Sequence, residues 1–145
     1  MIKRLVLDSG PLSMIAHPRP SADVAAWLAR LSELGVDVML PEIADFEVRR
    51  ELLRAGKSKS IRRLDIIRAQ LTFLPLDSDV MLRAAQMWAD ARRRGRPTAD
   101  DRELDVDVIL AAQAEQAGAS VATDNIGHLS QFVHAQSWRD FGVES

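Results

Sequence analysis

Four acidic residues that lie far apart in the sequence could together bind a divalent metal ion. They are Asp8, Glu47, Asp107 and Asp124. Carboxylate oxygens are the ligands that Mg²⁺ and Mn²⁺ prefer in proteins. Without a cation, two like charges about 4 Å apart repel each other by about 4 kcal/mol at an effective dielectric constant of about 20. If the fold brings these acids together, we therefore expect a bound Mg²⁺ or Mn²⁺ to hold them there.

Other acids are alternatives at two of these positions. Glu42 precedes Glu47 and suits the first turn of a helix, where it would complement the helix dipole. Glu51 lies one helical turn beyond Glu47 and could be solvated or paired with an arginine. The alternatives to Asp107 are Asp100, Asp101 and the possible helix cap Asp105. Asp8 and Asp124 could instead be ordinary turn residues, a common role of aspartate.

Three neutral polar residues adjoin the acids, namely Ser9, Thr123 and Asn125. Their hydroxyl and amide groups could orient a water molecule or a phosphate group. Ser9 is equally typical of a turn, and Thr123 of the end of a strand. We carry all three as candidate substrate-orienting or water-orienting residues.

Zinc is a less suitable ion than Mg²⁺ or Mn²⁺ for this chain. The sequence has no cysteine, and its three histidines show neither metal-ligand spacing nor a triad with a nucleophile. We expect these histidines to be structural or to lie at the surface: His17, His128 and His134.

Length and composition indicate an ordinary globular protein. The 145 residues are 47% hydrophobic and 28% charged, with a net charge of −2. We expect one domain over residues 1–145. No apolar run approaches the roughly 20 residues of a membrane helix, and the N-terminus lacks a signal-peptide pattern. The absence of cysteine fits a reducing compartment, so we expect a cytoplasmic location.

Positive charge is concentrated in two segments although the whole chain is slightly acidic. Eight of the 19 Lys and Arg residues lie between Arg49 and Arg68, and four more between Arg92 and Arg96. A basic rim beside an acidic metal site would suit a polyanionic substrate. The alternative is that these residues form the solvated faces of helices.

The hydrophobic pattern predicts an α/β fold that can bring the acids together. Apolar segments predict strands over 2–7, 36–40, 71–76, 119–123 and 132–137. Helical patterns separate them, with caps predicted at Ser21, at Ser58 or Ser60, and at Asp77 or Ser78. Pro41 suits the first position of a helix, and residues 8–11 break the first strand, with Pro11 a possible start of a short helix. We place Asp107 in the first turn of its helix.

This alternation predicts a mainly parallel central sheet of four to five strands flanked by helices on both faces. Ligands of such sheets lie beyond the carboxyl ends of the strands. Asp8 and Asp124 follow strands directly, so this edge is where we expect the acids to meet.

Four segments, in this order, resemble the PIN-domain nucleases. They are LVLDSG (5–10), LPEIADFEVRREL (40–52), DVILAAQA (107–114) and SVATDN (120–125). The branch that the chain resembles most is the VapC-type toxins of toxin–antitoxin pairs. The resemblance implies a PIN-like three-layer fold and endoribonuclease activity that depends on Mg²⁺ or Mn²⁺. It also implies an RNA substrate, a cognate antitoxin as partner and a homodimer.

Residue by residue, the resemblance assigns the first three catalytic and metal-binding acids to Asp8, Glu47 and Asp107. At the fourth position the chain differs, because the family often has an acid directly after Thr-Asn. Here Thr123 is followed by Asp124 and then Asn125. Either the acid is displaced to Asp124, or its role falls to Asn125.

Two other functions compete with the nuclease hypothesis. If neither residue 124 nor residue 125 completes the site, the chain would be a catalytically impaired PIN-like module that binds RNA or a protein partner. A phosphoacceptor receiver domain would need a second acid beside Asp8 and a lysine after the last strand, but no lysine follows Lys59.

Overall fold

One parallel sheet forms the centre of the protein. The computed structural model describes residues 2–95 and 101–140. Its five strands lie in the order β3-β2-β1-β4-β5, and every neighbouring pair is parallel. The strands are β1 (Arg4–Leu7), β2 (Asp37–Pro41), β3 (Thr72–Leu74), β4 (Ser120–Thr123) and β5 (Ala135–Ser137). The predicted α/β fold is confirmed.

The central strand is completely covered. Leu5, Val6 and Leu7 are each 0% exposed, as their unbroken apolar run predicts for a strand with helices on both faces. Val6 is paired with Met39 of β2 on one side and Val121 of β4 on the other. The carboxyl ends of β1 and β4 therefore lie side by side.

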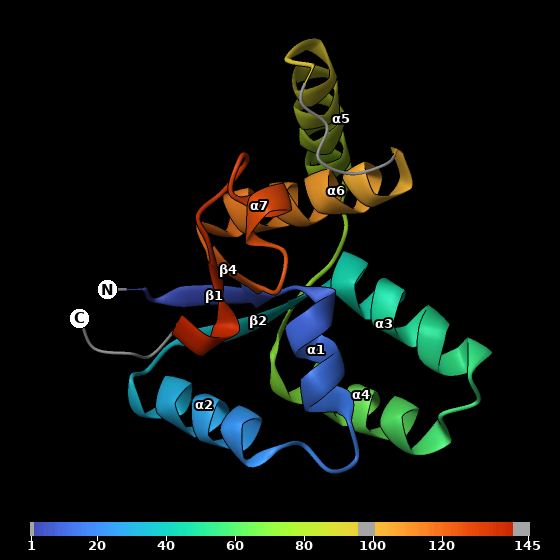
Figure 1. The fold of residues 1–145 in the computed structure, drawn as a ribbon, viewed down its shortest axis with the longest axis vertical. Coiled ribbons are helices and arrows are strands. Elements are labelled where there is room, and N and C mark those ends of the chain that lie inside the picture. The colour runs from blue at the N-terminus through green and yellow to red at the C-terminus, as the bar shows by residue number, and fades with distance from the viewer. Residues whose placement is uncertain (1, 96–100, 141–145) are drawn as a thin grey trace.

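Helices cover the two faces of the sheet unequally (Figure 1). The helices α1 (Ser9–Ala16), α2 (Ala22–Glu33) and α4 (Ser58–Gln70) lie on one side. On the other side lies α6 (Asp101–Ala117), with α5 (Ser78–Arg93) packed on it through a second, separate apolar cluster. The helix α3 (Glu42–Arg54) contacts α1, α4 and α6, and the short α7 (Ile126–Leu129) contacts α6. A 3₁₀ turn, Trp138–Asp140, follows β5.

Several helix starts differ from the predictions. The helix α1 begins at Ser9, ahead of Pro11, because the Asp8 side chain accepts a hydrogen bond from the Ser9 N–H and acts as N-cap. Pro41 is extended, closes β2 and is the N-cap of α3 rather than its first residue. Lys57 precedes α4 without a side-chain cap, so the predicted serine caps are wrong. Caps at Ser21 and Asp77 are confirmed.

Strands β3 and β5 are shorter than predicted because neighbouring residues have other hydrogen-bond partners. The N–H groups of Phe132 and Val133 donate to the Leu129 carbonyl and close the turn after α7, so β5 begins only at Ala135. The Leu76 N–H donates to the Glu42 carboxylate, beyond the end of β3.

Of the helices in the described ranges, none is both long and apolar enough to cross a membrane. The single domain over residues 1–145 stays a prediction.

Candidate active site

Asp8 is fixed at the junction of β1 and α1. Its side chain is buried, and its two carboxylate oxygens have different donors. The Ser9 N–H donates to Oδ1 at 2.7 Å, and the Thr123 hydroxyl donates to Oδ2 at 2.6 Å. Thr123, itself 0% exposed, accepts from the Asn125 N–H at 2.8 Å. The ends of β1 and β4 thus hold one buried carboxylate in a defined orientation.

A small cavity brings Asp8 together with acids from two helices. Its volume is about 130 Å³. It is lined by Asp8, Ser9, Glu47, Glu103, Val106, Asp107, Asn125 and His128. Glu47 comes from α3 and Asp107 from α6, so three of the four acids singled out from the sequence line one cavity. Ser9 and Asn125 line it too, whereas Thr123 acts from behind Asp8.

Glu47 has a strongly altered proton affinity. Burial raises its pKa from 4.5 to about 7, and the negative charges of Asp8 and Asp107 raise it further, while Arg50 opposes them. At neutral pH this carboxyl group therefore exchanges protons readily. A group with a pKa near the working pH is suited to accept or donate a proton during a reaction.

The pKa values of Asp107 and Asp8 are raised as well. Burial raises the pKa of Asp107 from 3.8 to about 6; His128 lowers it, and the charges of Asp8 and Glu103 raise it. The pKa of Asp8 is raised by burial, against the stabilising hydrogen bonds from Thr123 and Ser9. A cation bound in this cavity would stabilise the ionised forms of all three carboxyl groups.

Two cavity residues were missed in the sequence. Glu103 precedes Asp107 by four residues on α6, and this spacing places both on one face of the helix. His128 was expected to be structural or at the surface. In the structure His128 lines the cavity, and its Nδ1 lies 3.6 Å from Oδ2 of Asp107. The same spacing could have revealed Glu103, whereas no sequence signal indicated His128.

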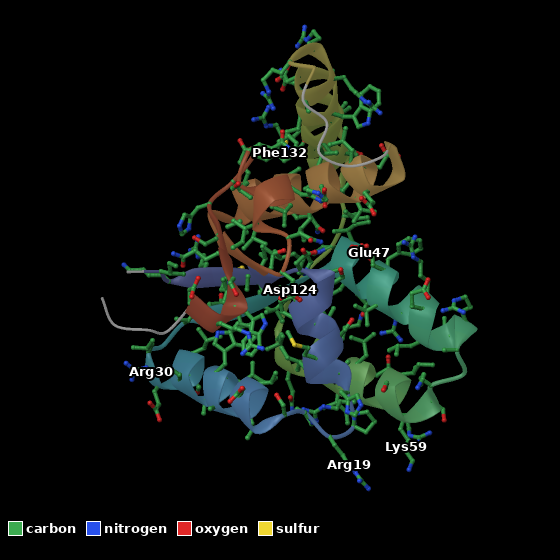
Figure 2. All side chains as sticks on the ribbon, viewed as in Figure 1. Arg19, Arg30, Glu47, Lys59, Asp124 and Phe132 are labelled. Carbon is green, nitrogen blue, oxygen red and sulfur yellow. The ribbon has the colours of Figure 1, made fainter. Side chains whose placement is uncertain are left out.

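Asp124 lies beside the cavity rather than in its wall. In Figure 2 it lies over the start of α1, and Glu47 lies on α3. The Asp124 carboxylate is so close to Gly10 that a Cβ atom at residue 10 would collide with it. Its charge still raises the pKa of Asp8. Of the two residues that could complete the site, Asn125 lines the cavity and Asp124 approaches the first turn of α1.

The alternative acids have other surroundings. Glu42 accepts the Leu76 N–H at 2.8 Å, and Glu51 forms an exposed ion pair with Arg54. Asp105 faces α5 and lines a different pocket between α5 and α6. Asp100 lies outside the described residues, and Asp101 begins α6, so the helix starts six residues before Asp107. Our prediction that Asp107 lies in the first turn of its helix is therefore wrong.

The comparisons with known proteins agree with this geometry. The family model of the PIN domain matches residues 5–131. The chain belongs to the PIN domain family. No curated protein matches the sequence.

Solved structures show the same fold. FitAcB from Neisseria gonorrhoeae is 28% identical with a TM-score of 0.74, and the match covers 94% of this chain and 99% of that one. VapBC2 from Rickettsia felis, bound to a DNA fragment from its promoter, is 14% identical with a TM-score of 0.77 over 93% and 98% of the two chains. DNA-bound VapBC from Salmonella typhimurium is 17% identical with a TM-score of 0.67, covering 95% and 99%. The resemblance to VapC-type PIN domains is confirmed.

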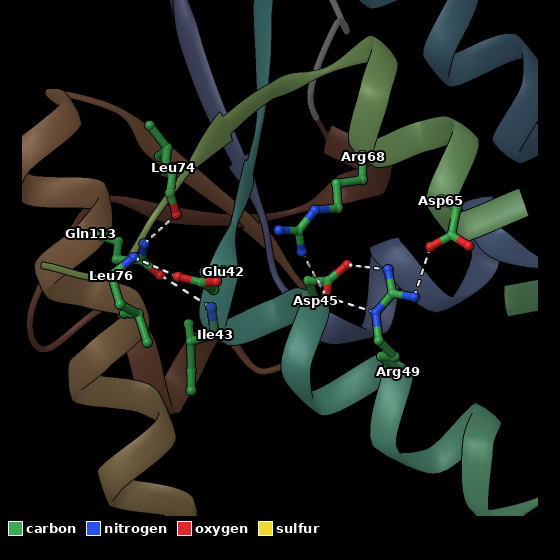
Figure 3. Close-up of polar contacts among 9 residues, drawn as sticks. All are labelled: Glu42, Ile43, Asp45, Arg49, Asp65, Arg68, Leu74, Leu76 and Gln113. Carbon is green, nitrogen blue, oxygen red and sulfur yellow. Dashed lines mark hydrogen bonds and ion pairs between the residues drawn. The ribbon is translucent and has the colours of Figure 1, made fainter. Parts of the chain in front are cut away.

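In this PIN domain, Gln113 connects the helices that carry the cavity acids (Figure 3). Its side chain is 1% exposed. Its amide nitrogen donates to the Leu74 carbonyl at 2.7 Å, and its amide oxygen accepts the Ile43 N–H at 3.3 Å. One buried amide thus joins α6 to the end of β3 and to the first turn of α3. It fixes the helix of Asp107 relative to the helix of Glu47.

We expect Gln113→Leu to lower the free energy of unfolding by about 2–3 kcal/mol. The change leaves a backbone N–H and a carbonyl buried without their partner, and each costs roughly 1–3 kcal/mol. Chemical denaturation measures the loss. The control is Gln86→Leu on exposed α5 surface, which we expect to stay within about 0.5 kcal/mol of wild type. A loss below about 0.5 kcal/mol for Gln113→Leu would contradict this role.

The basic segment of α3 and α4 is partly used for structure. Buried Asp45 accepts two hydrogen bonds from Arg49, at 3.0 and 3.1 Å, and pairs with Arg68 at 3.4 Å (Figure 3). Arg49 also pairs with Asp65 of α4 at 2.7 Å, and the hydrogen bond to Asp45 raises its pKa. These arginines hold α3 against α4. Arg50, in contrast, is exposed and its charge acts on Glu47 at the cavity.

Proposed function

We propose that this PIN domain is a divalent-metal-dependent endoribonuclease that hydrolyses RNA phosphodiester bonds. The observation that carries the proposal is the convergence of Asp8, Glu47 and Asp107, from three separate elements, on one cavity at the carboxyl edge of the sheet. PIN domains form a nuclease family, which supports a hydrolase acting on nucleic acids. A structural role would not require three carboxyl groups that each resist ionisation.

The donor set fits Mg²⁺ or Mn²⁺. Asp8, Glu47 and Asp107 offer carboxylate oxygens, and the cavity has room for water molecules to complete the coordination. As the side chains are oriented, no three acids or histidines of the described residues are arranged to share one ion. Rotations of these side chains would therefore have to accompany binding. Asp124 remains a candidate ligand through a larger rotation, and Asn125 a candidate for orienting water or phosphate.

When bound, such an ion supplies a more acidic water molecule and positive charge for the phosphate group. The protein residues then have separate tasks. Asp8, held by Thr123 and Ser9, would provide a fixed carboxylate, and Asp107 would provide a second one from α6. Glu47, which lines the same cavity from α3, would be the group that accepts the proton of the attacking water. Arg50, whose charge acts on Glu47, is a candidate to contact the phosphate backbone.

We further propose that the protein is the toxin of a toxin–antitoxin pair. This part rests on its likeness to VapBC and FitAcB structures, which extends over nearly the whole chain. The proposal includes a cognate antitoxin that blocks the cavity, a cytoplasmic location where RNA is available, and a homodimer. A small adjacent reading frame whose product copurifies with the protein and stops cleavage would support it.

The activity is tested with purified protein and total RNA. We expect cleavage in Mg²⁺ or Mn²⁺, none in EDTA, and recovery when excess ion is added back.

The placement of Asp124 beside Gly10 favours a second candidate, a PIN-like module that binds RNA or a protein partner without cutting. RNA that is bound but left intact at every Mg²⁺ and Mn²⁺ concentration would reject the nuclease and favour that module.

We expect Thr123→Val to weaken Mn²⁺ binding by about tenfold, a typical effect of removing the partner of a metal ligand. The substitution removes the donor to Asp8 and the acceptor of the Asn125 N–H. Titration calorimetry measures the affinity. Ser120→Ala is the matched control on the same strand, since Ser120 contacts His134 away from the cavity. Equal affinities of wild type and Thr123→Val would show that Thr123 does not position Asp8.

A further inference from the structure

We propose that His128 gives the metal site a nitrogen donor, so that the site favours a first-row transition ion over Mg²⁺. This inference rests on the proposed function, because it concerns the choice of ion at the same cavity. It assigns a role to a residue outside the four acids, and the consequence is a selectivity that carboxylates alone would not give.

The position of His128 supports this role. The residue lies on α7, which begins directly after Asn125, and it lines the cavity together with Asp8, Glu47 and Asp107. Its side chain is 28% exposed and that of Asp107 is 15% exposed, so the two face each other largely away from bulk water. The backbone of the turn is fixed, since the His128 N–H donates to the Asn125 carbonyl and the His128 carbonyl accepts from Gln131.

The two side chains are close enough for both to reach one ion. The distance from His128 Nδ1 to Asp107 Oδ2 is 3.6 Å, longer than a hydrogen bond. With metal–ligand distances of about 2.1 Å in octahedral geometry, neighbouring donors lie about 3 Å apart and opposite donors about 4 Å apart. The observed distance of 3.6 Å matches neither value, so a small movement of one side chain would bring both donors to one ion. In the described part of the chain, the ring makes no hydrogen bond that would compete with a ligand.

The chemistry of the donor decides which ion gains. Mg²⁺ prefers oxygen ligands and keeps its water molecules, so an imidazole adds little to its binding. Transition ions accept imidazole nitrogen, and their affinity for a given site rises from Mn²⁺ to Co²⁺. Loss of the imidazole should therefore weaken Co²⁺ binding most, Mn²⁺ binding less and Mg²⁺ binding least. A residue that merely supported the fold would weaken all three alike.

The test is titration calorimetry of Mg²⁺, Mn²⁺ and Co²⁺ with the full chain at pH 8, free of any histidine tag. We expect His128→Asn to lower Co²⁺ affinity by about tenfold or more, since even an indirect partner of a metal ligand contributes that much. We expect a smaller loss for Mn²⁺ and less than twofold for Mg²⁺. The visible absorption of bound Co²⁺ should also change, because it reports the donor atoms directly. His134→Asn, whose ring contacts Ser120 outside the cavity, is the control and should match wild type.

The outcomes separate this inference from the proposed function. An equal loss for all three ions, or none, overturns the role of His128. If Asp8→Asn abolishes binding of every ion while His128→Asn leaves the Co²⁺-to-Mg²⁺ ratio unchanged, the nuclease proposal stands and only this inference fails. If the wild-type protein binds no divalent ion, both fail.

Discussion

Asp107→Asn is expected to reduce RNA cleavage by at least a hundredfold while the protein remains folded. Asparagine keeps the size of the side chain but removes the negative charge that we propose to bind the ion. Substituting a residue that only supports a metal ligand typically costs 10–100-fold, so loss of a ligand itself should cost at least as much. Cleavage of total RNA at saturating Mn²⁺ measures the effect.

The same substitution should raise the stability of the metal-free protein. Burial and the negative charges of Asp8 and Glu103 raise the pKa of Asp107 to about 6, against the effect of His128. At pH 7.5 the carboxyl group is therefore ionised, and its ionisation destabilises the folded state relative to the unfolded state. The full shift corresponds to about 3 kcal/mol, and solvent in the cavity reduces it, so we expect a gain of about 1 kcal/mol.

The matched control for Asp107 is Asp105→Asn, two residues earlier on α6. Asp105 is exposed and faces α5, so its replacement should leave both cleavage and Mn²⁺ affinity unchanged. Undiminished cleavage by Asp107→Asn would contradict the assignment of Asp107. Equal losses in both variants would point to a disturbance of α6 as a whole.

The second large effect is a steep dependence of Mn²⁺ affinity on pH. Glu47, with a pKa of about 7, and Asp107, with a pKa of about 6, must both lose their protons to bind an ion. Each proton displaced gives a tenfold change per pH unit below the relevant pKa. We therefore expect the affinity to fall by at least about tenfold between pH 7.5 and pH 5.5 in titration calorimetry.

Stability of the metal-free protein should change in the opposite direction. A carboxyl group whose pKa is raised on folding favours the protonated folded state, so its contribution is most favourable below the unfolded pKa. For Glu47 this means a free energy of unfolding that decreases as the pH rises from about 4.5 to about 7. Denaturation in EDTA at several pH values measures this slope.

Glu47→Gln separates this group from the others. The variant should have a shallower pH dependence of both Mn²⁺ affinity and metal-free stability than wild type. Glu51→Gln, one turn further along α3 at an exposed ion pair with Arg54, should behave as wild type. A slope unchanged by Glu47→Gln would show that Glu47 does not titrate in this range.

The sequence predicted the sheet edge well because strand ends carry strong local signals. The apolar run 5–7 followed by Asp8, and the segment 119–123 followed by polar residues, predicted two strands ending in candidate ligands. The α/β pattern implied parallel strands, and the pairing of β1 with β4 in the structure brings Asp8 and Thr123 together. Glu47 and Asp107 could be selected because helical spacing and the resemblance to PIN domains agreed.

The remaining features depend on packing and on backbone turns that no local pattern encodes. The direction of the Asp124 side chain is set by the turn after β4 and by its closeness to Gly10. His128 lies on a helix of four residues, too short to show periodicity. Gln113 reads as an ordinary polar position within α6, and only the docking of α6 on β3 and α3 gives its amide two backbone partners.

Anomalous diffraction from crystals soaked in Mn²⁺ would locate the ion among the cavity residues. The expected result is a peak at about 2.0–2.6 Å from carboxylate oxygens of both Asp8 and Asp107. Crystals with Mn²⁺ bound only elsewhere on the molecule, or with no peak in this cavity at saturating Mn²⁺, would contradict the proposal that these acids form a metal centre.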